Sequence, residues 1–353
     1  MNKPIVAAST PSVVISDPTN FMVASVFCGI DVSAETLSVA VCGQGQGYRQ
    51  REFANRASGH QALIRWLGKG GSQVRVSLEA TGIYSLDLAL ALDAAEGIEV
   101  AVLNPKLVNR FAQTLRRSKT DAADAAVLAE YSRRMPFQSW QRPSVMAFQL
   151  RAITRQIESL TVQHTREQNR LHASEGSQAT PRCVVHDLRR SLVGLKRRTE
   201  KLRRAAIELI QGNDEMSLRF TLLIGMPGIG EISALHLLGE LAALAPEMKV
   251  RQWVAHSGLD PVHQNSGTSV HKASRISRAG SRHLRRALYM PALAAVRWDP
   301  HLKAFYEVLL ARHKSKLQAL IAVARKLLHA IYGIFKSRTP YDGNKLFPQL
   351  AIA

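Results

Sequence analysis

Cysteine is scarce in this sequence of 353 residues, and long apolar runs are missing from it. The three cysteines, Cys28, Cys42 and Cys183, form neither a CxxC pair nor a Cys/His spacing, which excludes the common zinc motifs and fits a reduced cytoplasm. No apolar run approaches the roughly 20 residues of a membrane span, so we expect no membrane partner. Residues 1–25 hold one basic residue and three prolines and no sustained apolar core. They are expected to be a disordered leader rather than a signal peptide.

Acidic charge is also in short supply. The chain has 27 Asp and Glu against 47 Lys and Arg, and a formal net charge of +20. Residues 1–140 hold 14 basic and 12 acidic residues, so +18 of this charge belongs to residues 141–353. Such a balance is typical of a protein with a polyanionic partner, most often nucleic acid. A basic membrane-surface protein is the other option, but no amphipathic anchor stands out.

The first part of the chain has the pattern of a mixed sheet. Strands are predicted at 26–32, 36–42, 48–54, 73–80 and 98–105, with helices between the later ones and at 106–115 and from residue 121. Three antiparallel strands followed by strand–helix–strand units indicate helices on both faces of the sheet. This is the element order of the ribonuclease-H-like fold, and we assign it to residues 26–140.

The rest of the chain is predicted to be all-α. Residues 145–172 and 184–211 have apolar residues at helical spacing, which predicts a long helical hairpin or coiled coil within residues 141–214. Two basic surface helices of a globular domain are the alternative. Residues 215–342 are expected to form a compact helical domain with a polar loop at 260–280, and residues 343–353 a tail. The predicted fold class is therefore α/β plus all-α.

Four acids stand at positions that suit metal binding. Asp31 and Glu79 end apolar strands, and Asp121 and Asp124 share a face at a helix start. Acids brought together repel one another unless a cation binds, and hard oxygen ligands favour Mg²⁺ or Mn²⁺. Two such ions can hold a phosphate during its transfer. Taken singly, each strand-end acid could be a turn residue, and Asp121 could simply complement the helix dipole.

Two further segments carry features of DNA contact. The turn GMPGIG (225–230) resembles a helix-hairpin-helix turn, in which Gly228 and Gly230 would let the backbone approach a phosphate. A tight helix connection is the alternative. The serine- and arginine-rich stretch 257–289 and the loop LRRSKT (115–120) are predicted to bind DNA. The basic residues concerned are Arg116, Arg117, Lys119, Lys272, Arg275, Arg278, Arg282 and Arg285.

Ser266, in the segment NSGTS, is a candidate nucleophile. A serine must be activated to act in this way. A nearby metal, His263 and His271 are alternative sources of that activation, and the sequence does not choose between them.

Taken together, these segments resemble the DEDD-type insertion-sequence transposases, the IS one-ten and IS eleven-eleven family. The resemblance rests on GIDVSAETLSVAV, SLEATGIY, VLNPKLVNRFAQTLRRSKTDAADAAVLAEY, QNRLHA, LLIGMPGIGEISALHLLGEL, HQNSGTSV and RRALYMPALAAVR, and spans about residues 26–342. It implies a RuvC-like domain, a coiled-coil linker and a C-terminal transposase domain.

The resemblance also implies roles for particular residues. Asp31, Glu79, Asp121 and Asp124 would bind Mg²⁺, and Ser266 would form a covalent intermediate with DNA, although the nearby Ser269 leaves that assignment open. A structured bridge RNA would choose donor and target DNA, and dimers would pair into tetramers. The expected enzyme is a site-specific DNA recombinase of the bacterial cytoplasm, bound to the nucleoid when active.

Three other functions remain as alternatives. A junction nuclease on the same fold would use the acids and water as nucleophile. A nucleic-acid binder without activity would have no use for the acids, which weaken DNA affinity unless metal occupies them. An ATPase of the sugar-kinase or actin type is suggested by GIDVS alone, and no later glycine-rich adenosine motif supports it.

Overall fold

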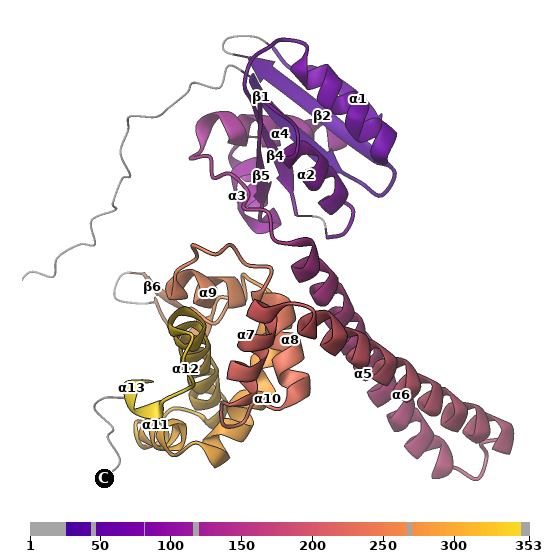
Figure 1. Cartoon of the computed structure of the whole chain (residues 1–353), viewed down its shortest axis with the longest axis vertical. Coiled ribbons are helices and arrows are strands. Elements are labelled where there is room, and N and C mark those ends of the chain that lie inside the picture. Colours follow the sequence, from indigo (N-terminus) through magenta and orange to yellow (C-terminus); the bar gives the residue numbers. More distant parts are fainter. Residues whose placement is uncertain (1–25, 44–46, 81, 116–119, 267–269, 347–353) are drawn as a thin grey trace, which may run out of the picture. The chain divides into compact units, whose positions relative to one another are not determined.

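The computed structural model describes residues 26–43, 47–80, 82–115, 120–266 and 270–346. The chain divides into two compact units after Arg142, a mixed α/β unit and a mainly helical one (Figure 1). This confirms the predicted combination of a mixed sheet with a helical part. The expected leader 1–25 and most of the expected tail lie outside the described residues.

A five-stranded mixed sheet forms the centre of the first unit. Its strands are β1 (Val26–Val32), β2 (Thr36–Gly43), β3 (Arg49–Ala54), β4 (Val74–Glu79) and β5 (Ile98–Leu103). The strand order is β3-β2-β1-β4-β5; the β3, β2 and β1 pairs are antiparallel, while β1–β4 and β4–β5 are parallel. Because β1 and β4 are parallel neighbours, their carboxyl ends meet at one edge of the sheet.

Helices cover both faces of this sheet. Side chains alternate along β1, so Cys28 and Ile30 pack with α1 (Ala57–Gly68) and α2 (Leu86–Asp93) in one apolar cluster. Phe27 points to the opposite face and packs with α4 (Asp121–Arg134). The short α3 (Pro105–Leu115) packs against α4 rather than against the sheet centre.

Two long helices open the second unit. Helix α5 (Val145–Glu175) and helix α6 (Arg182–Gln211) pack against each other, where the sequence predicts a helical pair (Figure 1). Ser144 caps α5, since its side chain accepts a hydrogen bond from the Ala147 amide. Helix α5 continues into the core of the unit by packing on α8, where Gly239 leaves room for the buried side chain of Thr154.

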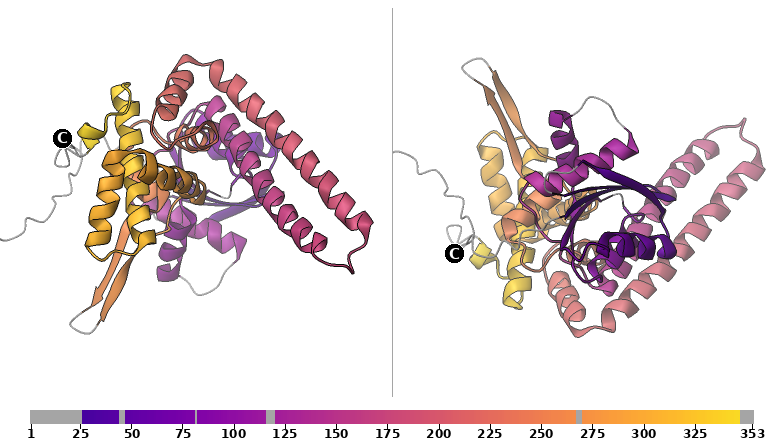
Figure 2. Two further views of the ribbon diagram at one scale, coloured as in Figure 1. Left: turned by 90° about the horizontal axis from the view of Figure 1, so that it is seen from below. Right: turned by 90° about the horizontal axis from the view of Figure 1, so that it is seen from above.

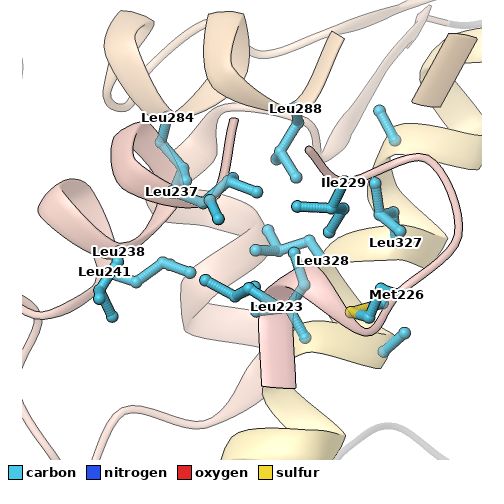
Figure 3. Packing of buried hydrophobic residues seen from close by; sticks show 14 of the residues in the cluster. Leu223, Met226, Ile229, Leu237, Leu238, Leu241, Leu284, Leu288, Leu327 and Leu328 are labelled. Carbon is cyan, nitrogen blue, oxygen red and sulfur yellow. The ribbon is translucent and has the colours of Figure 1, made fainter. Parts of the chain in front are cut away.

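The core of the second unit is made by the helices that follow α6. These are α7 (Asp214–Ile224), α8 (Glu231–Leu241), α9 (Val250–Ser257), α10 (Arg282–Trp298), α11 (Pro300–Ala311), α12 (Lys316–Ser337) and α13 (Gly343–Leu346). Figure 3 shows leucines of α8, α10 and α12 meeting in one cluster. Helix α12 alone among the described helices is long and apolar enough to cross a membrane, but nine of its residues are buried, and eight of these, among them Leu327 and Ile331, belong to this core.

The prediction of a polar loop at 260–280 is wrong. Strands β6 (Pro261–Ser266) and β7 (Val270–Ile276) form an antiparallel hairpin that extends from the helices of its unit (Figure 2). Among the described strands, these two pair only with each other. Their sequences, PVHQNS and VHKASRI, lack the regular alternation of apolar and polar residues that usually reveals a strand. The first residues of the expected tail are helical, since residues 343–346 form the helical turn α13, which contacts α11.

Candidate active site

Three of the four predicted acids meet at one edge of the mixed sheet. Carboxylate oxygens of Asp31, Asp121 and Asp124 all lie within 4.8 Å of one another. Asp31 is the penultimate residue of β1, and the other two occupy the first turn of α4. Asp31 and Asp124 are partly buried, while Asp121 is exposed. The cluster is therefore open to solvent on one side and supported by the sheet on the other.

Glu79 stands beside this cluster without joining it. The parallel register pairs Ile30 with Leu78, which places Asp31 and Glu79 at neighbouring positions on adjacent strands. Residues paired in register point to the same face of a sheet. Glu79 is partly buried, at the end of β4. The structure thus gathers Asp31, Asp121 and Asp124 within 4.8 Å and leaves Glu79 at the next strand end.

Gly29 allows α4 to reach the sheet. A Cβ atom at this position would lie 2.1 Å from the Ala125 carbonyl oxygen and 2.2 Å from the Ala129 amide nitrogen, distances that no real side chain tolerates. A glycine inside a strand often marks such an approach by another backbone. Gly29 is not among the site residues predicted from the sequence. A glycine inside an apolar strand, two residues before Asp31, is the sequence feature that indicates this contact.

The first turn of α4 is held by two further polar contacts. The Thr120 hydroxyl accepts a hydrogen bond from the Ala123 amide at 3.2 Å and caps the helix, as its sequence predicts. The Gln50 side chain, from β3, donates to the Ala122 carbonyl at 3.0 Å. Both contacts flank Asp121 and Asp124, so the two carboxylates start from an anchored backbone.

The opposite end of α4 is anchored by a buried acid. Glu130 is 4% exposed and accepts a hydrogen bond from the Tyr48 hydroxyl at 3.0 Å. It also pairs with Arg133 and Arg134. The Arg133 hydrogen bond is the main reason that the pKa of Glu130 is lowered, while burial opposes it and the Tyr48 hydrogen bond adds to the lowering. Because Glu130 is charged and paired, this end of α4 is held to the sheet.

Asn55 connects the loops that follow the two strand-end acids. Its amide nitrogen donates to the carbonyl of Ser33 at 2.7 Å and to that of Tyr84 at 3.0 Å. Its side-chain oxygen lies 2.8 Å from Nε2 of His60. Ser33 follows Asp31 by two residues, and Tyr84 lies in the loop after Glu79. We therefore count Asn55, like Gly29, among the positioning residues that sequence reasoning missed.

The donor set suits a divalent cation. Three carboxylates within 4.8 Å repel one another, and a bound cation would offset this repulsion. Oxygen ligands of this kind are those that Mg²⁺, Mn²⁺ and Ca²⁺ take in proteins. The open side of the cluster leaves room for a phosphate oxygen as a further ligand.

The predicted serine lies in the second unit. Ser266 is the last residue of β6, and its backbone pairs with Val270 of β7. The side chains of residues 263–273, which include Ser266 and Lys272, lie outside the described part of the structure, as do Ser269 and the loop residues Arg116, Arg117 and Lys119. Their predicted roles stay predictions.

Four predicted DNA-binding arginines lie at the end of this hairpin or after it. Arg275, Arg278 and Arg282 are exposed. Arg285 is partly buried, and its Nη1 donates to the Ser257 carbonyl at 2.7 Å. Burial is the main reason that the pKa of Arg285 is lowered, and the nearby Arg278 adds to this. Arg285 thus has a structural contact in addition to any contact with DNA.

The GMPGIG turn has a structural reason for one of its glycines. Gly228 has a φ of +87°, and a Cβ there would lie 2.6 Å from the Ala295 amide nitrogen on α10. This favours the alternative of a tight helix connection at Gly228. Gly230 is exposed, precedes the first residue of α8 and has open space around its Cα. Its predicted phosphate contact is therefore sterically possible.

Comparison with known proteins gives this arrangement a class. A family model for DEDD transposases of the IS110 type, described as "Transposase", matches residues 28–174 and so includes all four acids. A second model, "Transposase IS116/IS110/IS902 family", matches residues 221–307 and includes the β6–β7 hairpin. The protein is therefore a transposase, an enzyme that recombines DNA. Within this class, the chain belongs to the IS110 family of insertion-sequence transposases.

Relatives of known name agree with this family. The "Pilin gene-inverting protein" of Moraxella bovis is 28% identical over 321 residues, which cover 90% of this chain and 97% of that protein. The protein of the same name from Moraxella lacunata has the same identity and coverage. An uncharacterised 43.6 kDa protein of insertion element IS110 from Streptomyces coelicolor is 31% identical over 120 residues, covering 34% of this chain and 29% of its own length.

Proposed function

We propose that this transposase cuts and rejoins DNA with a divalent-metal site and a serine nucleophile. The metal site would consist of Asp31, Glu79, Asp121 and Asp124, with Mg²⁺ as the ion and Mn²⁺ as a possible substitute. The observation that carries the proposal is the meeting of Asp31, Asp121 and Asp124 within 4.8 Å at the carboxyl edge of the sheet. The nucleophile would be Ser266, at the end of β6.

The chemistry assigned to the chain's residues is a phosphoryl transfer. The Ser266 hydroxyl oxygen attacks a DNA phosphorus atom, and the bond from phosphorus to one strand's oxygen breaks. The serine proton leaves, the released strand ends in a hydroxyl group, and the phosphate of the other end stays on the serine. Attack by a strand hydroxyl on this phosphoserine restores a phosphodiester and frees the serine. When bound, Mg²⁺ would neutralise charge on the phosphate and favour ionisation of the attacking hydroxyl.

The wider organisation is also part of the proposal. We assign residues 26–140 to a RuvC-like domain, 141–214 to a coiled-coil region and 215–342 to a transposase domain that carries the serine. The exposed arginines beside the β6–β7 hairpin support DNA contact there. We propose that a structured bridge RNA selects donor and target, and that the protein works on nucleoid DNA as a dimer or tetramer, with the acids of one subunit meeting the serine of another. The formal net charge of +20 supports a nucleic-acid partner of this kind.

A trapping experiment tests the serine. The full-length protein is incubated with Mg²⁺, RNA transcribed from the flanks of its element and end-labelled donor and target DNA, then denatured and separated by electrophoresis. We expect labelled DNA to migrate with the protein for the wild type and for Ser274→Ala, a matched serine on β7. The adduct should disappear in Ser266→Ala. Loss in Ser269→Ala with retention in Ser266→Ala would move the nucleophile to Ser269.

A water-using junction nuclease is the second candidate. The acid cluster lies entirely within the first unit, and its three described members meet without any residue of the second. In that case Mg²⁺-dependent nicking would occur without a labelled adduct, and Ser266→Ala would leave the nicking rate unchanged. The same assay therefore separates the two candidates.

A further inference from the structure

We propose that a cleft beside the β6–β7 hairpin binds an unpaired nucleic-acid strand rather than a duplex. The inference deepens the proposed function and rests on it. The cleft has a volume of about 1070 Å³ and is formed by the base of the hairpin, the start of α10, the α11–α12 turn and α12. All of its lining residues belong to the second unit, whereas Asp31, Asp121 and Asp124 belong to the first.

Five cations line this cleft, and each comes from a different element or turn of the chain. Arg275 belongs to β7, Arg278 to the following turn and Arg285 to α10, while Lys314 precedes α12 and Arg325 lies on it. The lining contains no Asp or Glu among the described residues. Such a concentration of positive charge in the lining of one cleft favours a polyanionic ligand.

The cations are presented by an ordered backbone. Arg278 has a φ of +52°, and its amide donates to the carbonyl of Gly258 at 3.2 Å. Gly258 itself has a φ of +65°, and a Cβ there would lie 2.6 Å from the guanidinium of Arg285. A non-glycine residue in this region of φ costs free energy, and it persists where the surrounding contacts require it. The turn therefore holds Arg278 and Arg285 close together at the cleft.

The floor of the cleft distinguishes it from a plain phosphate-binding surface. Leu309, Leu317, Ile321 and Ala322 contribute apolar side chains from α11 and α12. Leu317 is 61% exposed, so an apolar surface faces solvent directly beside the cations. A phosphate group gains nothing from contact with an apolar surface, whereas the face of an unstacked base packs well against one.

The volume favours the same ligand. About 1,000 Å³ is the upper end of the range found for small-molecule pockets. A cleft of this size accommodates a few nucleotides of single strand inside it, whereas a double helix could only lie across its mouth. Recombination exposes such segments when strands separate, and a guide RNA contains unpaired stretches, so the ligand chemistry is a short run of unpaired nucleotides.

Binding measurements with full-length protein test this inference. The probes are a fluorescent single-stranded DNA of mixed sequence, the RNA of the same sequence and the corresponding DNA duplex, each without self-complementarity. The test variant is Lys314→Gln with Arg325→Gln. Its matched control is Arg297→Gln with Lys303→Gln, which removes the same charge from exposed positions of α10 and α11 outside the cleft.

We expect the test variant to bind single strands about tenfold more weakly and the duplex nearly as well as the wild type. The slope of log affinity against log salt should fall by roughly 1.4 for single strands, at about 0.7 for each lost phosphate contact. The control variant, Arg297→Gln with Lys303→Gln, should lower the affinities for single-stranded DNA, RNA and duplex DNA only slightly and by similar factors. A stronger effect on the DNA strand than on the RNA strand, or the reverse, identifies which source the cleft serves.

A second variant tests the apolar floor. Leu317→Asn keeps the charge and the branched shape of the side chain, and because Leu317 is exposed we expect the variant to fold as the wild type does. It should weaken single-strand binding several-fold without changing the salt slope, while Leu293→Asn on α10 should not. Equal weakening of single strands and duplex in the charge variant, or no weakening in either variant, would overturn the inference. A wild-type protein that binds none of the three probes would instead count against the proposed function itself.

Discussion

Gly29 and Ala125 are in direct backbone contact, since a Cβ on Gly29 would lie 2.1 Å from the Ala125 carbonyl oxygen. Gly29 and Asp31 point to the same face of β1, because side chains alternate along a strand. Ala125 directly follows Asp124 on α4. The contact that packs α4 on the sheet therefore also determines the distance between the carboxylates of Asp31 and Asp124.

The change Gly29→Ala should displace α4 and disable the acid cluster. Inserting a methyl group into a closely packed contact typically costs about 1–3 kcal/mol, and here the obstructing atoms are backbone. We expect a lower free energy of unfolding by urea denaturation, and loss of Mg²⁺-dependent DNA cleavage under conditions where circular dichroism shows the variant folded.

Gly68→Ala is the matched control for this change. Gly68 ends α1 in the same unit, and a Cβ there would meet nothing within 4 Å. This variant should be as stable and as active as the wild type. If Gly29→Ala cleaved DNA normally, the role we give to this contact would be wrong.

The acid cluster should bind divalent cations without DNA. Calorimetric titration of the wild type with Mn²⁺ should show binding that Asp31→Asn and Asp124→Asn each weaken by at least about tenfold, because each removes one of three converging charges. Asp93→Asn, at an exposed residue ending α2, should leave the binding unchanged. Equal binding by wild type and Asp31→Asn would argue against metal coordination by this cluster.

Sequence patterns predicted the elements of the sheet and most helices because burial determined them. The apolar run of β1 and the N-capping Thr120 before Asp121 are local signals, and the structure has the strand and the capped helix. The mixed sheet followed from the order of the elements along the chain, whereas the strand order β3-β2-β1-β4-β5 comes from the structure. The convergence of Asp31 with Asp121 and Asp124 followed in turn from that topology.

Other features depend on contacts between distant residues and have no local signal. The sequences of β6 and β7 do not alternate regularly between apolar and polar residues, so periodicity does not predict the hairpin. Gly228 looked like a phosphate contact because the residues of α10 that press on it lie more than sixty positions later. Asn55 bridges two loops through its amide, and nothing next to it in the sequence indicates either partner.

Glu240 should be a main determinant of the stability of the second unit. It is 5% exposed, and Arg155 on α5 donates to both of its oxygens, at 2.7 and 3.1 Å. The Ser281 hydroxyl, at the start of α10, adds a bond of 2.9 Å. Burial alone would raise the pKa of Glu240, but the bonds from Arg155 and Ser281 lower it on balance.

The change Glu240→Gln should therefore cost about 2–3 kcal/mol of unfolding free energy in urea, because it leaves Arg155 without its charge partner. The pair is partly screened, since the Arg155 side chain is 40% exposed. Glu167→Gln breaks the ion pair with Arg170, which is 67% exposed, and should cost under about 0.5 kcal/mol. Equal effects of the two substitutions would show that burial of the Glu240 pair has no consequence for stability.

Stability should decline in mild acid because of two histidines. Burial is the main reason that the pKa values of His236 and His256 are lowered, and nearby arginines add to this. Glu240 opposes the lowering at both histidines, and Glu158 opposes it more strongly at His236. Below the unfolded pKa of about 6.5, the unfolded chain takes up protons that the folded chain binds less readily. The free energy of unfolding should therefore be nearly constant above pH 7.5 and fall from pH 6.5 to 5.5.

In the double variant His236→Gln with His256→Gln, this dependence of the free energy of unfolding on pH should become weaker without vanishing, since the pKa of His329 is lowered in the same direction. Urea denaturation at four pH values measures the slope, and an unchanged slope in the double variant would contradict the assignment.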